Sequence, residues 1–152
     1  MSRPRRLDGF SYAGLAQYFL TTCTYQRRPT FLDHNIATQT IEQFRTTSRA
    51  EEFELLAYCV MPDHAHLLVE GLTERSDFRR FAKMVKQRAG AAYALTSDTP
   101  LWQKGYYEHV LREEEDAKEI ARYMIANPVR AGIAESPDQY PYSGSDNGRS
   151  VN

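Results

Sequence analysis

A short turn between two strand-like runs is the feature that most constrains the fold. Residues 53–61 and 64–70 are mostly apolar, and only a Pro-Asp pair separates them. So short a connection favours an antiparallel hairpin, because parallel strands need a long crossover. His64 and His66 stand two apart in the second run, so their side chains project from one face. Two neutral imidazoles held in this way form half of a site for a divalent metal, although a bare pair with this spacing is more often two ordinary surface histidines.

The rest of the chain alternates between strand-like and helix-like segments. Aromatic and threonine-rich stretches predict strands, and apolar residues at helical spacing predict helices. In chain order we expect a strand over 16–25, a helix over 35–50, the hairpin, a helix over 75–95, a strand over 101–111 and a helix over 113–126. This β-α-β-β-α-β order with a further helix predicts an α+β fold of the ferredoxin-like (split βαβ) type: an antiparallel sheet with helices on one face and an extra C-terminal helix.

Length and composition predict a single domain over residues 1–152, and its 41% of hydrophobic residues is enough for an ordinary core. Within it, residues 1–14 read as a basic N-terminal arm and residues 131–152 as a loosely packed tail. The longest apolar run has seven residues, far short of the ~18 of a membrane span, and we find no signal peptide. We therefore expect a cytoplasmic protein that does not associate with membranes.

A net charge of -1 gives no global sign of nucleic-acid binding, but the basic residues are clustered. One cluster lies in the N-terminal arm and another on one face of the helix over 75–95, where it is either a solvated face or a contact surface for phosphates. The residues are Arg3, Arg5, Arg6, Arg79, Lys83 and Lys86.

Tyr123 and Asn127 lie four residues apart on the last predicted helix, and therefore on the same side of it. Taken singly, a tyrosine there is usually a core residue, and an asparagine before proline usually ends a helix. Together with the paired histidines they suggest a site. The asparagine can offer a carbonyl oxygen to a metal, and the tyrosine can offer a hydroxyl nucleophile beside it.

These segments resemble a known family. Residues 62–69 (PDHAHLLV) resemble the HUH signature (histidine, apolar residue, histidine) of single-tyrosine DNA transposases. Residues 123–132 (YMIANPVRAG) resemble the tyrosine-bearing helix of that family, and the NPVRAG run is typical of its REP-associated tyrosine transposase branch. Residues 102–112 and 140–143 also fall where that branch has similar segments, so the resemblance covers residues 10 to 144.

The resemblance implies a metal-dependent endonuclease and strand transferase that acts on single-stranded, hairpin-forming DNA such as REP-like palindromes. Tyr123 would attack the phosphodiester to give a 5′-phosphotyrosine link and a free 3′-OH. His64, His66 and Asn127 would hold Mg²⁺ or Mn²⁺. The protein would act as a monomer or a homodimer, and Tyr123 would serve the histidines of its own chain or those of a partner. Further candidates for DNA contact are His109, which is alternatively a support for the metal site, and Arg130.

Two other hypotheses remain open at this stage. The run His64 to Glu70 also fits the H-x-H-x-x-x-E ligand pattern of cupin-like metal enzymes, which would make Glu70 a ligand. Cupins, however, are all-β barrels, whereas this chain has three helical stretches. The second hypothesis is a non-catalytic module that binds hairpin nucleic acid with the same fold.

Overall fold

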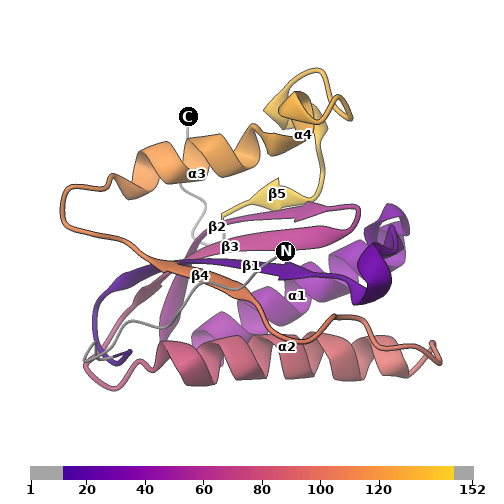
Figure 1. Ribbon diagram of the computed structural model, residues 1–152. Helices are drawn as coiled ribbons and strands as arrows, with labels where there is room; N and C mark the ends of the chain where they lie inside the picture. The colour runs from indigo at the N-terminus through magenta and orange to yellow at the C-terminus, as the bar shows by residue number, and fades with distance from the viewer. Residues whose placement is uncertain (1–11, 146–152) are drawn as a thin grey trace.

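The computed structural model describes residues 12–145, which form one antiparallel sheet with helices on both faces (Figure 1). The strand order is β4-β1-β3-β2-β5. The strands are β1 (Gln17–Cys23), β2 (Phe53–Met61), β3 (His64–Gly71), β4 (Tyr107–Val110) and β5 (Ser143–Gly144). The α-helices are α1 (His34–Ala50), α2 (Phe78–Ala94), α3 (Ala117–Ile125) and α4 (Asn127–Arg130), and short 3₁₀ turns occur at Tyr25–Arg27, Thr30–Leu32 and Pro137–Gln139. The predicted α+β, ferredoxin-like fold is confirmed.

The predicted hairpin is present, and it fixes the register at the centre of the sheet. Met61 of β2 lies opposite His64 of β3, so the chain reverses through Pro62 and Asp63 alone. On its other side β3 pairs with β1 along its length, from Cys23 opposite His64 to Gln17 opposite Glu70. The histidine strand is therefore the central strand of the sheet.

Helices α1 and α2 cover one face of the sheet and enclose the main core. Asp33 and Asp77 cap the two helices, their carboxylates accepting hydrogen bonds from backbone amides three residues on, at 3.1 and 3.2 Å. Fully buried aromatic rings fill the space between the layers, and the rings of Tyr18 and Phe78 stack with centroids 4.1 Å apart. Burial of such large side chains makes this face the principal source of stability.

Helix α3 crosses the opposite face and buries a much smaller cluster (Figure 1). Its apolar stripe follows the predicted helical spacing and packs against Ala57 of β2 and Leu68 of β3. The helical members of the cluster are Ala121, Met124 and Ile125, flanked by Ala117 and Ile120. The rest of this sheet face carries polar and aromatic side chains.

Two predicted boundaries near the C-terminal half were wrong. The fourth strand is only Tyr107–Val110, because Gly105 adopts a left-handed φ of 79° and turns the chain just before it. Helix α3 begins at Ala117 rather than at 113, because Glu115 already accepts a hydrogen bond from the Arg112 amide at 2.9 Å and so closes a turn ahead of the helix. Asp116 then caps the helix.

The described part of the predicted tail, residues 131–145, has no buried residue, but hydrogen bonds attach it to the sheet. Strand β5 pairs with β2, and the Val60 amide donates to the carbonyl oxygen of Tyr142 at 2.8 Å. The Tyr140 hydroxyl donates to the Val60 carbonyl oxygen. The Tyr142 hydroxyl lies 2.9 Å from Nδ1 of His34. Hydrogen bonds that span some eighty residues of sequence thus anchor the tail, and sequence periodicity cannot show them.

Most of the predicted N-terminal arm, including Arg3, Arg5 and Arg6, lies outside the described residues. Residues 12–14 run beside the start of α2, where the Phe78 amide donates to Tyr12 and the Gly14 amide donates to Ser76, both at 2.8 Å. Among the helices in the described range, none is both long and apolar enough to cross a bilayer.

Candidate active site

The two predicted histidine ligands lie on the α3 side of the sheet. Along β3, Ala65 and Leu67 are fully buried in the core under α1 and α2, whereas Leu68 is buried under α3. Alternation therefore turns His64 and His66 toward α3. Their ring centroids are 4.8 Å apart at an interplanar angle of 76°. The strand thus presents two adjacent imidazoles on the less covered face.

His64 is oriented by the turn that precedes it. Its Nδ1 lies 2.7 Å from Oδ1 of Asp63, and because a carboxylate only accepts, Nδ1 is the donor of this hydrogen bond. The other oxygen of Asp63 accepts from Arg27 at 2.9 Å. Burial alone would raise the pKa of Asp63, but the hydrogen bonds from His64 and Arg27 hold it below its usual value. Arg27 itself adopts a left-handed φ of 53°, a conformation costly enough to need such anchoring.

His66 is held by the neighbouring strand. Its Nδ1 lies 2.8 Å from the hydroxyl oxygen of Thr21, its partner across the β1–β3 ladder, and its ring stacks on Phe19 at 5.3 Å. Burial, and to a lesser extent the nearby charges of His64 and Arg130, lower the pKa of His66 to about 3. The imidazole is therefore neutral near neutral pH, which is the form that binds metals.

The predicted nucleophile lies on α3 at the edge of its apolar stripe. Tyr123 is 66% exposed, so it is not the core residue that a tyrosine at such a position usually is. The guanidinium of Arg130 lies over the ring instead, 3.7 Å from its centroid. Arg130 also reaches the side-chain oxygen of Asn127 at 3.5 Å. Residues at positions 123, 127 and 130 thus form one ladder along the end of α3 and α4.

The NPVRAG run produces this ladder. Pro128 has no amide hydrogen and ends α3, yet its fixed φ suits the first turn of α4. Gly132 ends α4 with a left-handed φ of 77°, and its amide donates to Val129 at 3.0 Å. The resulting break keeps Asn127 and Arg130 beside Tyr123.

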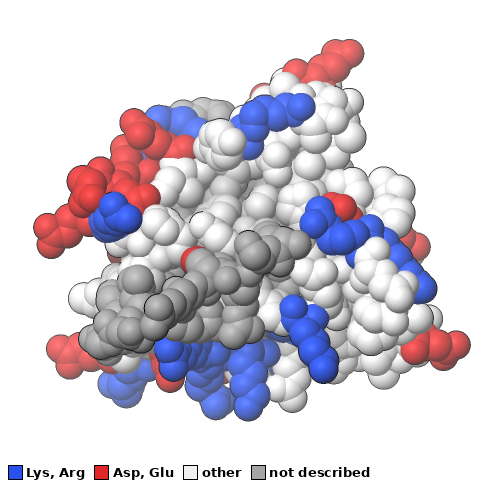
Figure 2. Space-filling view, viewed as in Figure 1, with Lys and Arg blue, Asp and Glu red and all other residues white. Residues whose placement is uncertain are grey.

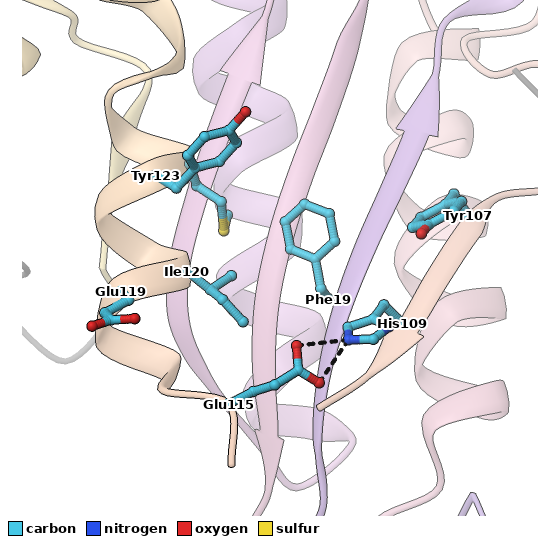
Figure 3. Close-up of a pocket in the computed structure, with 8 residues that line it drawn as sticks. Phe19, Tyr107, His109, Glu115, Glu119, Ile120 and Tyr123 are labelled. Carbon is cyan, nitrogen blue, oxygen red and sulfur yellow. Dashed lines mark hydrogen bonds and ion pairs between the residues drawn. The ribbon is translucent and has the colours of Figure 1, made fainter. Parts of the chain in front are cut away.

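An open groove of about 430 Å³ runs between α3 and strands β1 and β4 (Figure 3). Phe19 lies at its centre, with Tyr123 on the helix side and Tyr107 on the strand side. At one end His109 donates from Nε2 to both oxygens of Glu115, at 2.9 and 3.0 Å. The Arg112 amide first and His109 second hold the pKa of Glu115 below its usual value. The groove also includes Glu119, Ile120 and Met124.

The donor atoms suit a hard divalent ion bound by two histidines and one further oxygen. Each histidine has its Nδ1 engaged by a hydroxyl or a carboxylate, the arrangement that directs Nε2 toward a metal. No three His, Cys, Asp or Glu side chains of residues 12–145 converge in the manner of a metal centre. A third protein ligand from this part of the chain would be of another type, and the amide oxygen of Asn127, which accepts from Arg130 at 3.5 Å, has suitable chemistry.

The cupin-like hypothesis does not fit this geometry. Glu70 is four positions after His66 along β3, which is about 13 Å at the usual rise per residue. Leu68, buried under α3, lies between them on the same face. The fold is also a single open sheet with helices rather than a barrel.

The basic face of α2 lies across the sheet from the histidines. In Figure 2 basic side chains gather along the lower edge, where Figure 1 places α2. Arg79 stacks on Tyr12 at 4.4 Å, and Nζ of Lys86 donates to the carbonyl oxygens of Gln103 and Gly105 at 3.0 and 2.7 Å. Lys83 is exposed. The structure therefore does not bring these three residues to the site, and Lys86 has a structural role that the helical-wheel argument missed.

Comparisons with known proteins show the family of this chain. The family described as "Transposase IS200 like" matches residues 13–127. The chain belongs to this transposase family. A Haemophilus influenzae protein, assigned provisionally to the REP-associated tyrosine transposases, is 30% identical over 159 residues, covering 94% of this chain and 85% of its own. The REP-associated tyrosine transposase of Escherichia coli is 27% identical over 95 residues, covering 62% of this chain and 56% of its own.

Solved structures give the same assignment. A REP-associated tyrosine transposase bound to a REP hairpin has a TM-score of 0.76 and 25% identity, over 94% of this chain and 82% of that one. A provisionally assigned transposase from Deinococcus radiodurans has a TM-score of 0.55 and 25% identity, over 88% of this chain and 99% of that one. The chain thus falls in the REP-associated branch of the single-tyrosine transposases that its motifs resembled.

Several residues of the site were not predicted from the sequence. Asp63 directly precedes the histidines, so a search for their hydrogen-bond partners could have found it. Thr21 and Phe19 become neighbours of His66 only through the β1–β3 register, and Arg27 only through the turn after β1. Glu115 falls in the segment predicted to begin the last helix, whereas it is the partner of His109.

Proposed function

We propose that this transposase binds hairpin-forming DNA and cuts a single strand with Tyr123 as nucleophile. The observation that carries the proposal is the placement of Tyr123 and the His64/His66 pair on the same face of one sheet. Arg130 links the two, because it stacks on the Tyr123 ring and lies close enough to His66 to affect its pKa. The solved relative bound to a REP hairpin supports DNA of this kind as the ligand.

His64, His66 and Asn127 would hold Mg²⁺ or Mn²⁺. An ion there supplies charge stabilisation to the attacked phosphate. Residues of the chain prepare this site for an ion. Hydrogen bonds with Asp63 and Thr21 orient the two imidazoles, and the low pKa of His66 keeps that ring unprotonated. Asn127 begins α4, four residues after Tyr123, and its side-chain oxygen accepts a hydrogen bond from Arg130.

The proposed reaction is a transesterification. The Tyr123 oxygen attacks the phosphorus and loses its proton, while the bond from phosphorus to the 3′ oxygen breaks and that oxygen takes a proton. One phosphodiester replaces another, so a 3′-OH from a second strand can reverse the step without ATP. Arg130, whose guanidinium lies over the Tyr123 ring, would offer positive charge to the non-bridging phosphate oxygens.

The ladder of Tyr123, Asn127 and Arg130 also supports the use of each tyrosine with the histidines of its own chain. Mixing the His64→Ala and Tyr123→Phe variants tests this point. Chains that act on their own should give an inactive mixture, whereas exchange of tyrosines between partners should restore part of the cutting.

The main experiment asks whether a covalent species forms with a hairpin oligonucleotide and Mg²⁺ or Mn²⁺ on a denaturing gel. Wild type should form it, and Tyr123→Phe should bind the same DNA without forming it. Tyr93→Phe, the same change on α2, is the control and should behave as wild type. DNA binding without any adduct in wild type would instead establish the non-catalytic module, and absence of hairpin binding would reject both functions.

A further inference from the structure

The groove beside Tyr123 has no assigned ligand, and its lining is unlike that of a phosphate site. Of the eight side chains that form it, none is a lysine or an arginine, and two are the carboxylates Glu115 and Glu119. A phosphate placed there would meet like charge. A basic group lies just outside the groove, where the guanidinium of Arg130 covers the ring of Tyr123. The charges therefore favour the sugar-phosphate backbone near Arg130. In the groove they favour an uncharged part of the ligand.

The shape and surface of the groove fit a flat aromatic ring. Its walls are the rings of Phe19 and Tyr107 and the apolar side chains of Ile120 and Met124 (Figure 3). Aromatic walls of this kind stack unpaired bases. Its volume of about 430 Å³ falls within the ~300–1,000 Å³ of small-molecule sites.

One end of the groove carries a polar group with fixed geometry. Glu115 accepts from His109 through both oxygens and from the Arg112 amide, so neither residue of the His109–Glu115 pair is free to rotate. A base edge that approaches this end meets an ordered acceptor and an imidazole. Such a group recognises the hydrogen-bonding edge of a base rather than its backbone.

We infer that the groove holds one unpaired nucleobase of the bound strand, next to the phosphodiester that Tyr123 attacks. This inference rests on the proposed function, since it takes the DNA strand as given. Phe19 connects the two sites: it lines the groove and stacks on His66 at 5.3 Å. A base stacked in the groove fixes the position of its own phosphate relative to the histidines. The groove therefore determines which phosphodiester of the strand lies beside Tyr123.

The test uses a hairpin oligonucleotide with single-stranded flanks whose binding has been shown by fluorescence anisotropy. 2-Aminopurine, which loses fluorescence on stacking, replaces the flank bases one position at a time. The Tyr123→Phe protein is used, so that binding is measured without cutting. One position should be quenched well beyond its neighbours, and an abasic site at that position should weaken binding about 5- to 100-fold, the range for loss of one stacked base.

Tyr107→Leu should reduce the quenching at that position, and the control Tyr93→Leu on α2 should not. If Tyr107→Leu fails to fold, photocrosslinking of 5-iodouracil DNA to the Tyr123→Phe protein gives an independent measurement, with the crosslink expected on Phe19 or Tyr107. Uniform quenching, or crosslinks only outside the groove, would overturn the inference even if wild type cuts the hairpin normally. Failure of the proposed function is distinguishable, because it appears as absent binding or an absent adduct.

Discussion

The two faces of the sheet differ in what they bury. Under α1 and α2 the side chains are large and fully enclosed, with stacked rings such as Tyr18 on Phe78. Under α3 the buried cluster has only five residues, and the rest of the face is histidines, threonine and an open groove. The difference indicates that one face maintains the fold and the other is free to carry chemistry. Substitutions on the two faces should therefore separate stability from activity.

The largest expected effect is on cutting. His64→Ala or His66→Ala should each lower the rate of strand cleavage by ~10³-fold or more, since loss of a bound ion removes several kcal/mol of stabilisation of the phosphate charge. Hairpin affinity should stay close to wild type, because phosphate contacts dominate it. The matched control is His34→Ala on the other side of the sheet, which should leave the rate unchanged. Wild-type cutting by both site variants would contradict the assignment of the metal site.

The next effect is on stability, and it belongs to the other face. Phe78→Ala removes a fully buried ring and should lower the free energy of unfolding by ~3–5 kcal/mol. Phe19→Ala, at the half-buried groove, should cost clearly less in urea unfolding but should impair cutting by the folded protein. Equal losses of stability would show that the two faces do not divide these roles.

A smaller effect is expected from pH. The pKa of His66 is near 6.5 in the unfolded chain and about 3 in the native protein, so below pH 6.5 only the unfolded state takes up the proton. The free energy of unfolding is therefore unaffected by this group above pH 6.5, and it decreases as the pH falls from 6.5 toward 3. Between pH 7 and pH 4, wild type should lose up to ~3 kcal/mol more than His66→Gln.

Urea unfolding in the presence of EDTA measures this difference, and EDTA keeps metal binding out of the comparison. Acidic groups common to both proteins cancel. Parallel curves for wild type and His66→Gln would show that His66 is protonated as easily in the native state as in the unfolded chain.

The smallest effects concern DNA affinity, and they compare the charges of the two faces. Arg130→Glu should weaken hairpin binding and lower the slope of log affinity against log salt by about 1. Reversal of both Arg79 and Lys83 on α2 should leave that slope unchanged, because α2 covers the face away from the histidines. A lower slope for the α2 variant would restore the DNA contact that the sequence alone suggested.

Local patterns predicted much of this structure. Period-two alternation placed His64 and His66 on one face, and the short Pro-Asp connection predicted the hairpin. These features depend on neighbours in the sequence, so the chain itself displays them.

Features that depend on distant contacts were missed. Thr21 meets His66 through strand register, Glu115 turns back to His109 instead of starting the helix, and Tyr140 binds the carbonyl of Val60. The contact of Arg130 with the ring of Tyr123 was missed as well. Each of these depends on how elements dock, which periodicity does not encode.

The most direct test of the account is peptide mapping of the trapped covalent adduct. Of the ten tyrosines in the chain, Tyr106 and Tyr107 are the rivals of Tyr123, since Tyr107 lines the same groove and Tyr106 adjoins it in sequence. After digestion, mass spectrometry should place the nucleotide on the peptide that contains Tyr123, and Tyr123→Phe should yield no modified peptide. A nucleotide on Tyr106 or Tyr107, or full cutting by Tyr123→Phe, would contradict the account.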